Sequence, residues 1–196
     1  FNSLIIPARD ETLPFQLQLN DIEQLFYSIT AESNPLKRTR DAALVALLCF
    51  EGLKAHEIIN LLWHDLLIIK NKASLRIKGS RKRVLTLFNR TTKLLKDYKK
   101  QKSTLAIHTK TNSNMFISFK GKGSTNIQPK LTRHGLKFLL YEHSESKGRT
   151  VVNTEKLRHF AIRYHLTLGK SPETIMTHLG LKRLGNITKH ICQSAN

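Results

Sequence analysis

Arg158 and His159 are the residues best placed to do chemistry, because they stand at the start of a segment with the apolar spacing of a buried helix. Burying an unpaired guanidinium would cost several kcal/mol, so we expect Arg158 to face a ligand. Further along, Leu179 and Gly180 precede a polar turn and a last short stretch. Residues 153–191 are therefore the first candidate for a functional site.

A second group of cations lies around a predicted turn in the middle of the chain. Residues 75–78 and 83–87 alternate apolar with basic or polar residues, which is typical of strands, and Gly79 and Ser80 between them indicate a turn. The apolar run at residues 66–69 supplies another strand. We therefore predict a small antiparallel three-stranded β-sheet. Its polar side is expected to present Arg76, Lys78, Arg81 and Arg83.

Helices are expected to make up most of the rest, so the chain is predicted to be mainly α with the small sheet added. Asn20 is the predicted N-cap of the first helix, and Gly52, Gly169 and Gly180 are expected to end later ones. Residues 108–129 are mostly polar and are predicted to be mainly loop. The expected helices cover approximately residues 21–31, 37–50, 55–63, 91–102, 131–145, 157–168, 173–179 and 187–192.

The charge of the chain indicates a polyanionic partner. The formal net charge is +19, and it is divided unevenly. Residues 1–65 hold nine acidic and five basic side chains, whereas residues 66–196 hold five acidic and twenty-eight basic ones. Such a basic half is typical of proteins that bind nucleic acid. The alternative interpretation is a basic surface that only keeps the protein soluble.

Cysteine usage and hydropathy exclude several classes of protein. Cys49 and Cys192 are the two cysteines, Cys49 is expected in the core, and no Cys/His spacing fits a disulfide framework or a zinc site. We expect no metal and no cofactor. The longest apolar run, Ala42–Phe50, is too short to span a bilayer, and no secretory signal is visible. We expect a cytoplasmic, nucleoid-associated protein, or a nuclear one if the source is eukaryotic.

These segments together resemble motifs of the tyrosine recombinases, the phage-integrase family, in their C-terminal catalytic domain. Residues 52–58 and 62–65 are similar to the family's Thr-Gly-Leu-Arg-x-x-Glu-Leu and Leu-x-Trp-x-Asp box. Residues 77–84 are similar to its hairpin, Gly-Lys-Gly-x-Lys-x-Arg. Residues 155–159 and 179–181 stand where the family has His-x-Leu-Arg-His and Leu-Gly-His. The resemblance covers most of the chain and implies the fold of the DNA breaking-rejoining enzymes.

The resemblance implies roles for several cations. Arg158 matches the second catalytic arginine, and His159 matches a histidine that usually packs beside it. Lys78 matches the hairpin lysine that acts as general acid toward the leaving 5′-oxygen. Lys54 stands where the family has its first catalytic arginine. A lysine offers a phosphate only a point charge there, whereas an arginine binds it with two parallel hydrogen bonds.

Three other family positions carry residue types that do not suit the reaction. Glu155 replaces a histidine that assists proton transfer, and an ionised carboxylate repels a phosphate. Leu181 replaces a histidine or tryptophan and cannot hydrogen-bond an oxyanion. His190 falls on the nucleophilic tyrosine, whose attack gives a 3′-phosphotyrosyl link. The tyrosines at positions 27, 98, 141 and 164 all precede the Leu-Gly motif.

We interpret the chain as an inactive member of the family that still binds double-stranded DNA, since most DNA affinity comes from distributed phosphate contacts. The basic helix around residues 93–102 would add phosphate contacts. Its expected role is accessory, regulatory or architectural in recombination or transposition. Candidate protein partners are an active recombinase, a transposase or a second copy, and no membrane is expected. The predicted DNA-binding residues are Lys54, Lys78, Arg81, Lys82, Arg83, Arg158 and His159.

Two other functions stay open. The chain could be an active recombinase that uses His190 or a nucleophile supplied in trans, or it could be a protein-interaction scaffold. For the domain organisation, we expect residues 1–18 to be a linker and residues 19–196 to be one recombinase-like domain. Because the chain begins with Phe1 rather than Met, we expect a fragment that lacks an N-terminal core-binding domain.

Overall fold

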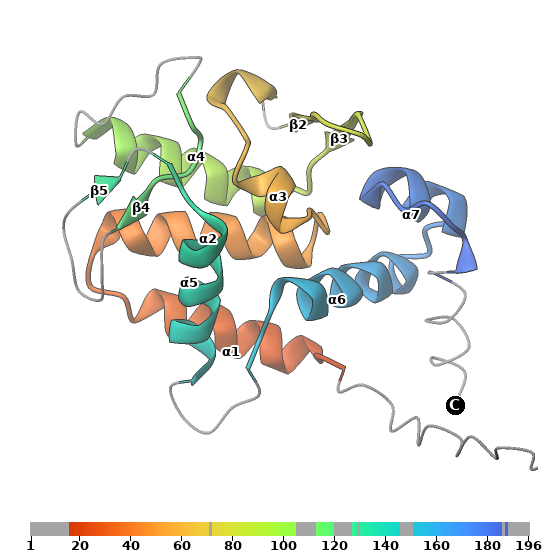
Figure 1. Ribbon diagram of the computed structural model, residues 1–196, viewed down its shortest axis with the longest axis horizontal. Helices are drawn as coiled ribbons and strands as arrows, with labels where there is room; N and C mark the ends of the chain where they lie inside the picture. Colours follow the sequence, from red (N-terminus) through yellow and green to blue (C-terminus); the bar gives the residue numbers. More distant parts are fainter. Residues whose placement is uncertain are drawn as a thin grey trace, which may run out of the picture.

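A long, almost entirely buried helix, α2, forms the axis of the fold (Figure 1). All its residues from Arg40 to Cys49 are buried, as expected of a helix that is covered on every side. Pro35 occupies its first turn, and the side chain of Asn34 caps it by accepting two backbone N–H bonds at 3.0 and 3.1 Å. Burial also raises the pKa of the Cys49 thiol, which confirms Cys49 as a core residue.

The computed structural model describes residues 16–70, 72–104, 113–119, 127–128, 130–145, 151–185 and 187. Within them the fold is mainly α with a small antiparallel three-stranded sheet, as predicted. None of the described helices is long and apolar enough to cross a membrane. The helices are α1 (Leu19–Thr30), α2 (Pro35–Cys49), α3 (Ala55–Ile58), α4 (Asn89–Thr104), α5 (Arg133–Glu145), α6 (Thr154–Thr167) and α7 (Pro172–Leu179), with a 3₁₀ helix, η1, at Trp63–Asp65.

The other helices are arranged around α2. Helices α1, α4 and α6 pack directly on it, and α5 packs on α1 and α3. Figure 1 shows α4 and α1 on opposite sides of α2, with α7 at the far end of α6. Tyr164 of α6 packs against Phe50, Phe88 and Phe160 and is therefore part of the aromatic packing of the core. A smaller apolar cluster, which includes Ala161, joins α6 to α7.

The three-stranded sheet has the order β1 (Leu66–Ile69), β2 (Lys72–Ile77) and β3 (Arg83–Thr86). The prediction of a polar outer side is wrong in two respects. First, Arg83 lies opposite Ile77 in the register, and its side chain turns inward. Second, the outer side exposes apolar residues. Together with Arg76 it presents Leu67, Ile69 and Val84, which are 59%, 61% and 67% exposed.

Some predicted boundaries are wrong because of contacts distant in sequence. The helix expected over residues 55–63 ends at Ile58, because the following residues hydrogen-bond to the segment around residue 114. Part of the loop expected over residues 108–129 forms a two-stranded sheet, β4 (Ser118–Phe119) with β5 (Ile127–Gln128). The N-cap of α1 is Gln18 and not Asn20. Of the helix expected at 187–192, all but Ile187 lies outside the described residues.

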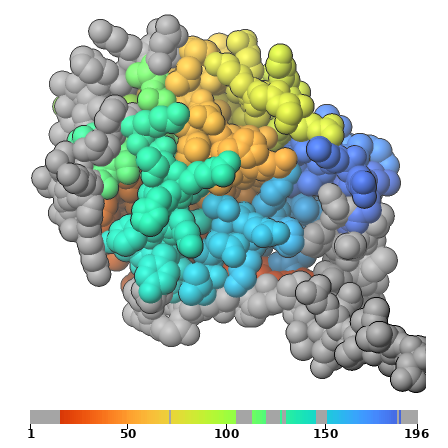
Figure 2. All heavy atoms as spheres, viewed as in Figure 1, coloured from red at the N-terminus to blue at the C-terminus, as the bar shows by residue number. Residues whose placement is uncertain are grey.

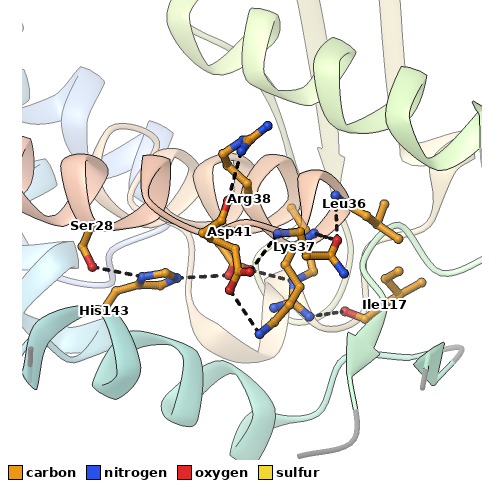
Figure 3. Close-up of polar contacts among 10 residues, drawn as sticks. Ser28, Leu36, Lys37, Arg38, Asp41, Ile117 and His143 are labelled. Carbon is orange, nitrogen blue, oxygen red and sulfur yellow. Dashed lines mark hydrogen bonds and ion pairs between the residues drawn. The ribbon is translucent and has the colours of Figure 1, made fainter. Parts of the chain in front are cut away.

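A buried polar network fastens α1, α2 and α5 together (Figure 3). Ser28 Oγ lies 3.3 Å from His143 Nδ1, and His143 Nε2 lies 3.1 Å from Asp41 Oδ2. Arg40 donates to the other oxygen of Asp41 at 2.6 Å and to the carbonyl of Ile117 at 3.3 Å. The order Ser-His-Asp is that of a hydrolase triad, but the guanidinium neutralises the carboxylate that would have to stabilise an imidazolium. The network is therefore a structural brace.

Candidate functional site

Arg158, in α6, ties together two segments that are distant in sequence. The helix begins where it does because Asn153 caps it, accepting a backbone N–H bond at 2.8 Å. The guanidinium donates Nη1 to the carbonyl of Gly52 and Nη2 to the carbonyl of Leu179, the latter at 2.6 Å. Burial lowers the pKa of Arg158 to about 10, so the group stays charged at neutral pH. A guanidinium has five N–H donors, and these two bonds do not exhaust it.

Glu57 is the carboxylate around which the cations gather. It lies in α3, where it accepts the backbone N–H of Lys54 at 2.8 Å. Arg83 donates to both its oxygens at 2.7 and 3.1 Å, and the two side chains are 7% and 3% exposed. Burial alone would raise the pKa of Glu57, but the bonds from Arg83 and the Lys54 amide outweigh it and lower that pKa. Arg83 also donates Nε to the carbonyl of His178 at 2.7 Å, which fastens β3 to α7.

Lys54 completes what we call the cation cluster, made of Lys54, Arg81, Arg83 and Arg158. Lys54 is half-buried just before α3. Burial and the nearby charge of Arg158 lower the pKa of Lys54, and Arg83 and Arg81 add to this, while Glu57 opposes it. Three basic side chains thus lie around one carboxylate, and Arg81 adds a fourth charge beside Lys54. This local excess of positive charge suits an anionic ligand such as a phosphodiester.

Lys78 follows β2, next to the cross-strand pair that contains Arg83. Its side chain is 50% exposed, and its Nζ lies 2.9 Å from Asp65 Oδ1. The same Nζ lies 2.7 Å from His64 Nε2. The hairpin lysine is therefore held by two residues of η1 at the edge of the candidate site.

The other predicted site residues divide into two groups. The exposed ones are Arg81 and Lys82 at the β2–β3 turn, with Glu155 and His159 on α6. Leu181 is half-buried and packs on the apolar cluster between α6 and α7, while His190 lies outside the described residues. Figure 2 shows the hairpin in yellow, α3 in orange, α5 in teal and α6 and α7 in blue, side by side on one face.

The basic helix α4 uses part of its charge inside the protein. Lys102 is 1% exposed, donates to the carbonyl of Asn114 at 3.2 Å and lies over the ring of Trp63. Burial lowers the pKa of Lys102 to about 8. Lys96 donates to the carbonyl of Lys70 at 3.0 Å. These side chains stabilise the fold, whereas Lys93, Lys99 and Lys100 remain exposed.

The sequence model of the phage integrase family matches residues 16–190. The chain belongs to the phage integrase family. Tyrosine recombinase XerC of Psychromonas ingrahamii is 26% identical over 176 residues, which cover 89% of this chain and 54% of that protein. XerC of Staphylococcus aureus (strain USA300) is 22% identical over 191 residues, covering 97% of this chain and 60% of that protein. The chain thus spans a little more than half the length of these relatives.

Solved structures of tyrosine recombinases share this fold. The crystal structure of XerA recombinase superposes with a TM-score of 0.73 at 18% identity, over 90% of this chain and 60% of that one. The pre-cleavage complex of XerH with its difH substrate gives 0.70 at 22% identity, over 90% of this chain and 49% of that one. The described elements are therefore those of a phage integrase family catalytic domain, as the motifs predicted.

Several residues of this phage integrase site escaped prediction from the sequence. Glu57 and Asp65 lie inside a motif that resembled the family, and that was the signal available for them. A cavity of about 440 Å³ adjoins the site between α3, α5 and the start of α6. Its lining includes Arg133 and Lys137 on α5 and His56 on α3. No motif pointed to Arg133 or Lys137, because the fold alone brings α5 beside α3, and His56 stands at a variable position of the motif at residues 52–58.

A second set of ionisable groups lies behind the site, where α2 ends against α7. The Glu51 side chain is 0% exposed, and its Oε2 lies 3.3 Å from His178 Nε2. The ring of His178 lies 4.7 Å from that of His165. His165 donates Nε2–H to the carbonyl of Phe50 at 2.7 Å and accepts from Lys170 at 3.2 Å, so it is neutral. Burial lowers the pKa of His165 to about 4.

This pKa predicts a loss of stability in acid. In the unfolded chain a histidine has a pKa near 6.5, which is above the pKa of His165 in the folded protein. The free energy of unfolding is therefore unaffected by this group above about pH 6.5 and decreases as the pH falls toward 4. We expect His165 to account for roughly 2 kcal/mol of that decline. Urea unfolding at both ends of this range measures it. In His165→Gln, the loss between them should be smaller by that amount, and an unchanged loss would contradict the assignment.

Proposed function

We propose that this phage integrase family domain binds double-stranded DNA through the cation cluster and the β2–β3 hairpin. The cation cluster is the observation that carries the proposal, because Lys54, Arg83 and Arg158 lie around the carboxylate of Glu57 and Arg81 adds a fourth positive charge beside Lys54. The face that contains it also presents the exposed Lys82. Relatives support the choice of ligand, since XerH was solved with its difH substrate and the Tn1549 integrase with circular intermediate DNA.

We further propose that the domain no longer cleaves DNA. Leu181 packs on apolar side chains in place of a hydrogen-bond donor, and Glu155 puts a carboxylate at the start of α6. Position 190 is histidine in place of the nucleophilic tyrosine. Tyr98 is fully buried, and burial raises its pKa further above neutrality, which makes it a poor nucleophile.

The role that follows is accessory, regulatory or architectural in recombination or transposition, with residues 19–196 acting as one domain. Such a protein would work on DNA in the cytoplasm, at the nucleoid, or in the nucleus of a eukaryote. An active recombinase, a transposase or a second copy is the protein partner we propose. The +19 charge supports the DNA part of this role, because nucleic-acid binding is strengthened by counterion release.

Arg158→Ala is expected to weaken duplex binding by about tenfold, because it removes a charged donor from the centre of the site. Titrations of a native-locus and a random duplex, from about 50 to about 200 mM salt, measure the loss together with the salt slope. Lys72→Ala, which removes one exposed charge from β2 and is not among the predicted DNA-binding residues, is the matched control. Arg158→Lys, with thermal unfolding of each variant, separates loss of charge from loss of folding.

Equal losses in Arg158→Ala and Lys72→Ala would mean generic polycation binding and would contradict the proposal. Incubation with the duplexes followed by denaturing electrophoresis tests for cleavage. We expect no covalent protein–DNA adduct. An adduct that disappears in a His190→Ala variant would instead establish an active recombinase with a histidine nucleophile. If the parent chain shows no salt-dependent binding to either duplex, the remaining function is that of a protein-interaction scaffold.

A further inference from the structure

Lys78, His64 and Asp65 place three polar atoms within hydrogen-bonding distance of one another. Lys78 Nζ lies 2.7 Å from His64 Nε2 and 2.9 Å from Asp65 Oδ1, and the last two atoms are 3.2 Å apart. The side chains differ in exposure: 1% for Asp65, 29% for His64 and 50% for Lys78. One buried carboxylate oxygen therefore faces two groups that can each carry a positive charge.

The carboxylate of Asp65 is fixed in position by the backbone. Its Oδ2 accepts the N–H of Leu62 at 3.0 Å, which leaves Oδ1 turned toward Lys78 and His64. Both η1 residues are held by the neighbouring sheet, because η1 packs against β2. Lys78 sits on a hairpin turn, so it is the member of the trio best able to move.

The short contact between Lys78 and His64 determines which ring nitrogen carries a proton. An ammonium can only donate, so a nitrogen 2.7 Å from Nζ must accept. His64 is therefore neutral in this arrangement, with its proton on Nδ1. A proton on Nε2 would set two hydrogen-bond donors against each other and leave Nε2–H facing Asp65 Oδ1 instead.

We propose that His64 is a positioning residue for Lys78. The neutral imidazole holds the ammonium against Asp65. The protonated imidazole takes over Asp65 and releases the ammonium to a DNA phosphate. This inference rests on the proposed DNA binding of the same face. It adds a residue that the family motifs do not include, because His64 occupies the variable position of Leu-x-Trp-x-Asp.

Charged side chains from three described elements lie near His64. Within η1 the charged neighbour is Asp65, and from the end of β2 it is Lys78. From α4, Lys99 and Lys102 approach η1, each with its Nζ 5.6 Å from the ring of Trp63. Imidazole is the side chain that ordinarily changes charge between about pH 5 and 8, so the release of Lys78 is tested by comparing pH values across that range.

The first test needs no DNA. Two-dimensional ¹H–¹⁵N spectra of the imidazole nitrogens at about pH 8 report which one is protonated. We expect His64 to carry its proton on Nδ1 in the parent chain. In Lys78→Ala we expect the proton on Nε2, where it can bond to Asp65. A proton on Nε2 in the parent chain would overturn the inference whatever the protein does with DNA.

The second test measures duplex affinity at about pH 6 and about pH 8. The parent chain should gain about fivefold more affinity on acidification than His64→Gln, which keeps an acceptor but does not titrate. The difference should vanish when both chains also carry Lys78→Ala. His134→Gln, which removes an exposed histidine on α5, is the control for general histidine charging.

The outcomes separate the two proposals. No salt-dependent binding by the parent chain at either pH would refute the DNA-binding function. Binding with equal acid gains in the parent chain and His64→Gln would refute the role of His64 and leave the function standing. An acid gain that survives Lys78→Ala would also refute it, because the released ammonium could not then be the cause.

Discussion

Replacing Glu57 with glutamine is expected to lower the free energy of unfolding by about 3 to 5 kcal/mol. The carboxylate is 3% exposed and neutralises Arg83 through two hydrogen bonds, so its loss leaves a guanidinium buried and uncompensated. At roughly 2 to 4 °C per kcal/mol for a domain of this size, the melting temperature should fall by about 6 to 20 °C. Thermal and urea unfolding measure the change.

The matched control for Glu57→Gln is Arg76→Ala, which removes an exposed guanidinium from the outer side of the sheet that contains Arg83. That variant should lose less than about 0.5 kcal/mol. A double variant, Glu57→Met with Arg83→Met, should be more stable than Glu57→Gln alone, since the guanidinium of Arg83 is then not left buried without its partner. If Glu57→Gln and Arg76→Ala lose equal stability, the ion pair is not the connection that we describe.

Gly180→Ala is expected to cost about 2 to 4 kcal/mol, for two separate reasons. Gly180 has φ +63°, in the left-handed region that ends α7 and that alanine disfavours by about 1 to 2 kcal/mol. A Cβ there would also lie 2.8 Å from Nη1 of Arg83. The guanidinium would have to leave Glu57 or the carbonyl of His178. Urea unfolding of the variant gives the total.

Gly169→Ala separates the two reasons. Gly169 has φ +71°, but a Cβ at that position meets nothing within 4 Å. Its substitution should therefore show the conformational cost alone, about 1 to 2 kcal/mol. If the two substitutions lower the free energy of unfolding equally, the side chain of Arg83 moves aside at no energetic cost. That result would contradict the tight connection between β3 and α7.

The sequence predicted the residues of the site better than their partners. The apolar spacing after Arg158 was enough to place it near the start of a helix, and the alternation around Gly79 was enough for the hairpin with Lys78. Both patterns are local. The acceptors of Arg158, the carbonyls of Gly52 and Leu179, are backbone atoms 106 and 21 positions away, and side-chain patterns carry no information about them.

The side of the sheet on which Arg83 lies was predicted wrongly. Arg83 was predicted on the polar side with Arg76, yet it is two positions before Leu85 and so shares the buried side of β3 with it. The alternation of β3 therefore indicates that Arg83 lies on the buried side. The prediction was wrong because it assumed that a cation must face solvent. The end of α3 was a different kind of error, because the residues after Ile58 bond to a segment around residue 114.

The bonds that build the cation cluster also have a consequence for the order in which the protein becomes functional during synthesis. Arg83 hydrogen-bonds to the carbonyl of His178, which lies 95 positions later in the chain. Arg158 hydrogen-bonds to the carbonyl of Gly52, 106 positions earlier, and to that of Leu179 in α7. Helices α1, α2 and α4 can pack while the ribosome is still working, but the cation cluster, through which we propose that the protein binds DNA, cannot form until α7 has emerged. Nascent chains stopped before α7 are therefore expected to contain much of the core but not to bind DNA, so the proposed binding would begin only when synthesis is almost finished.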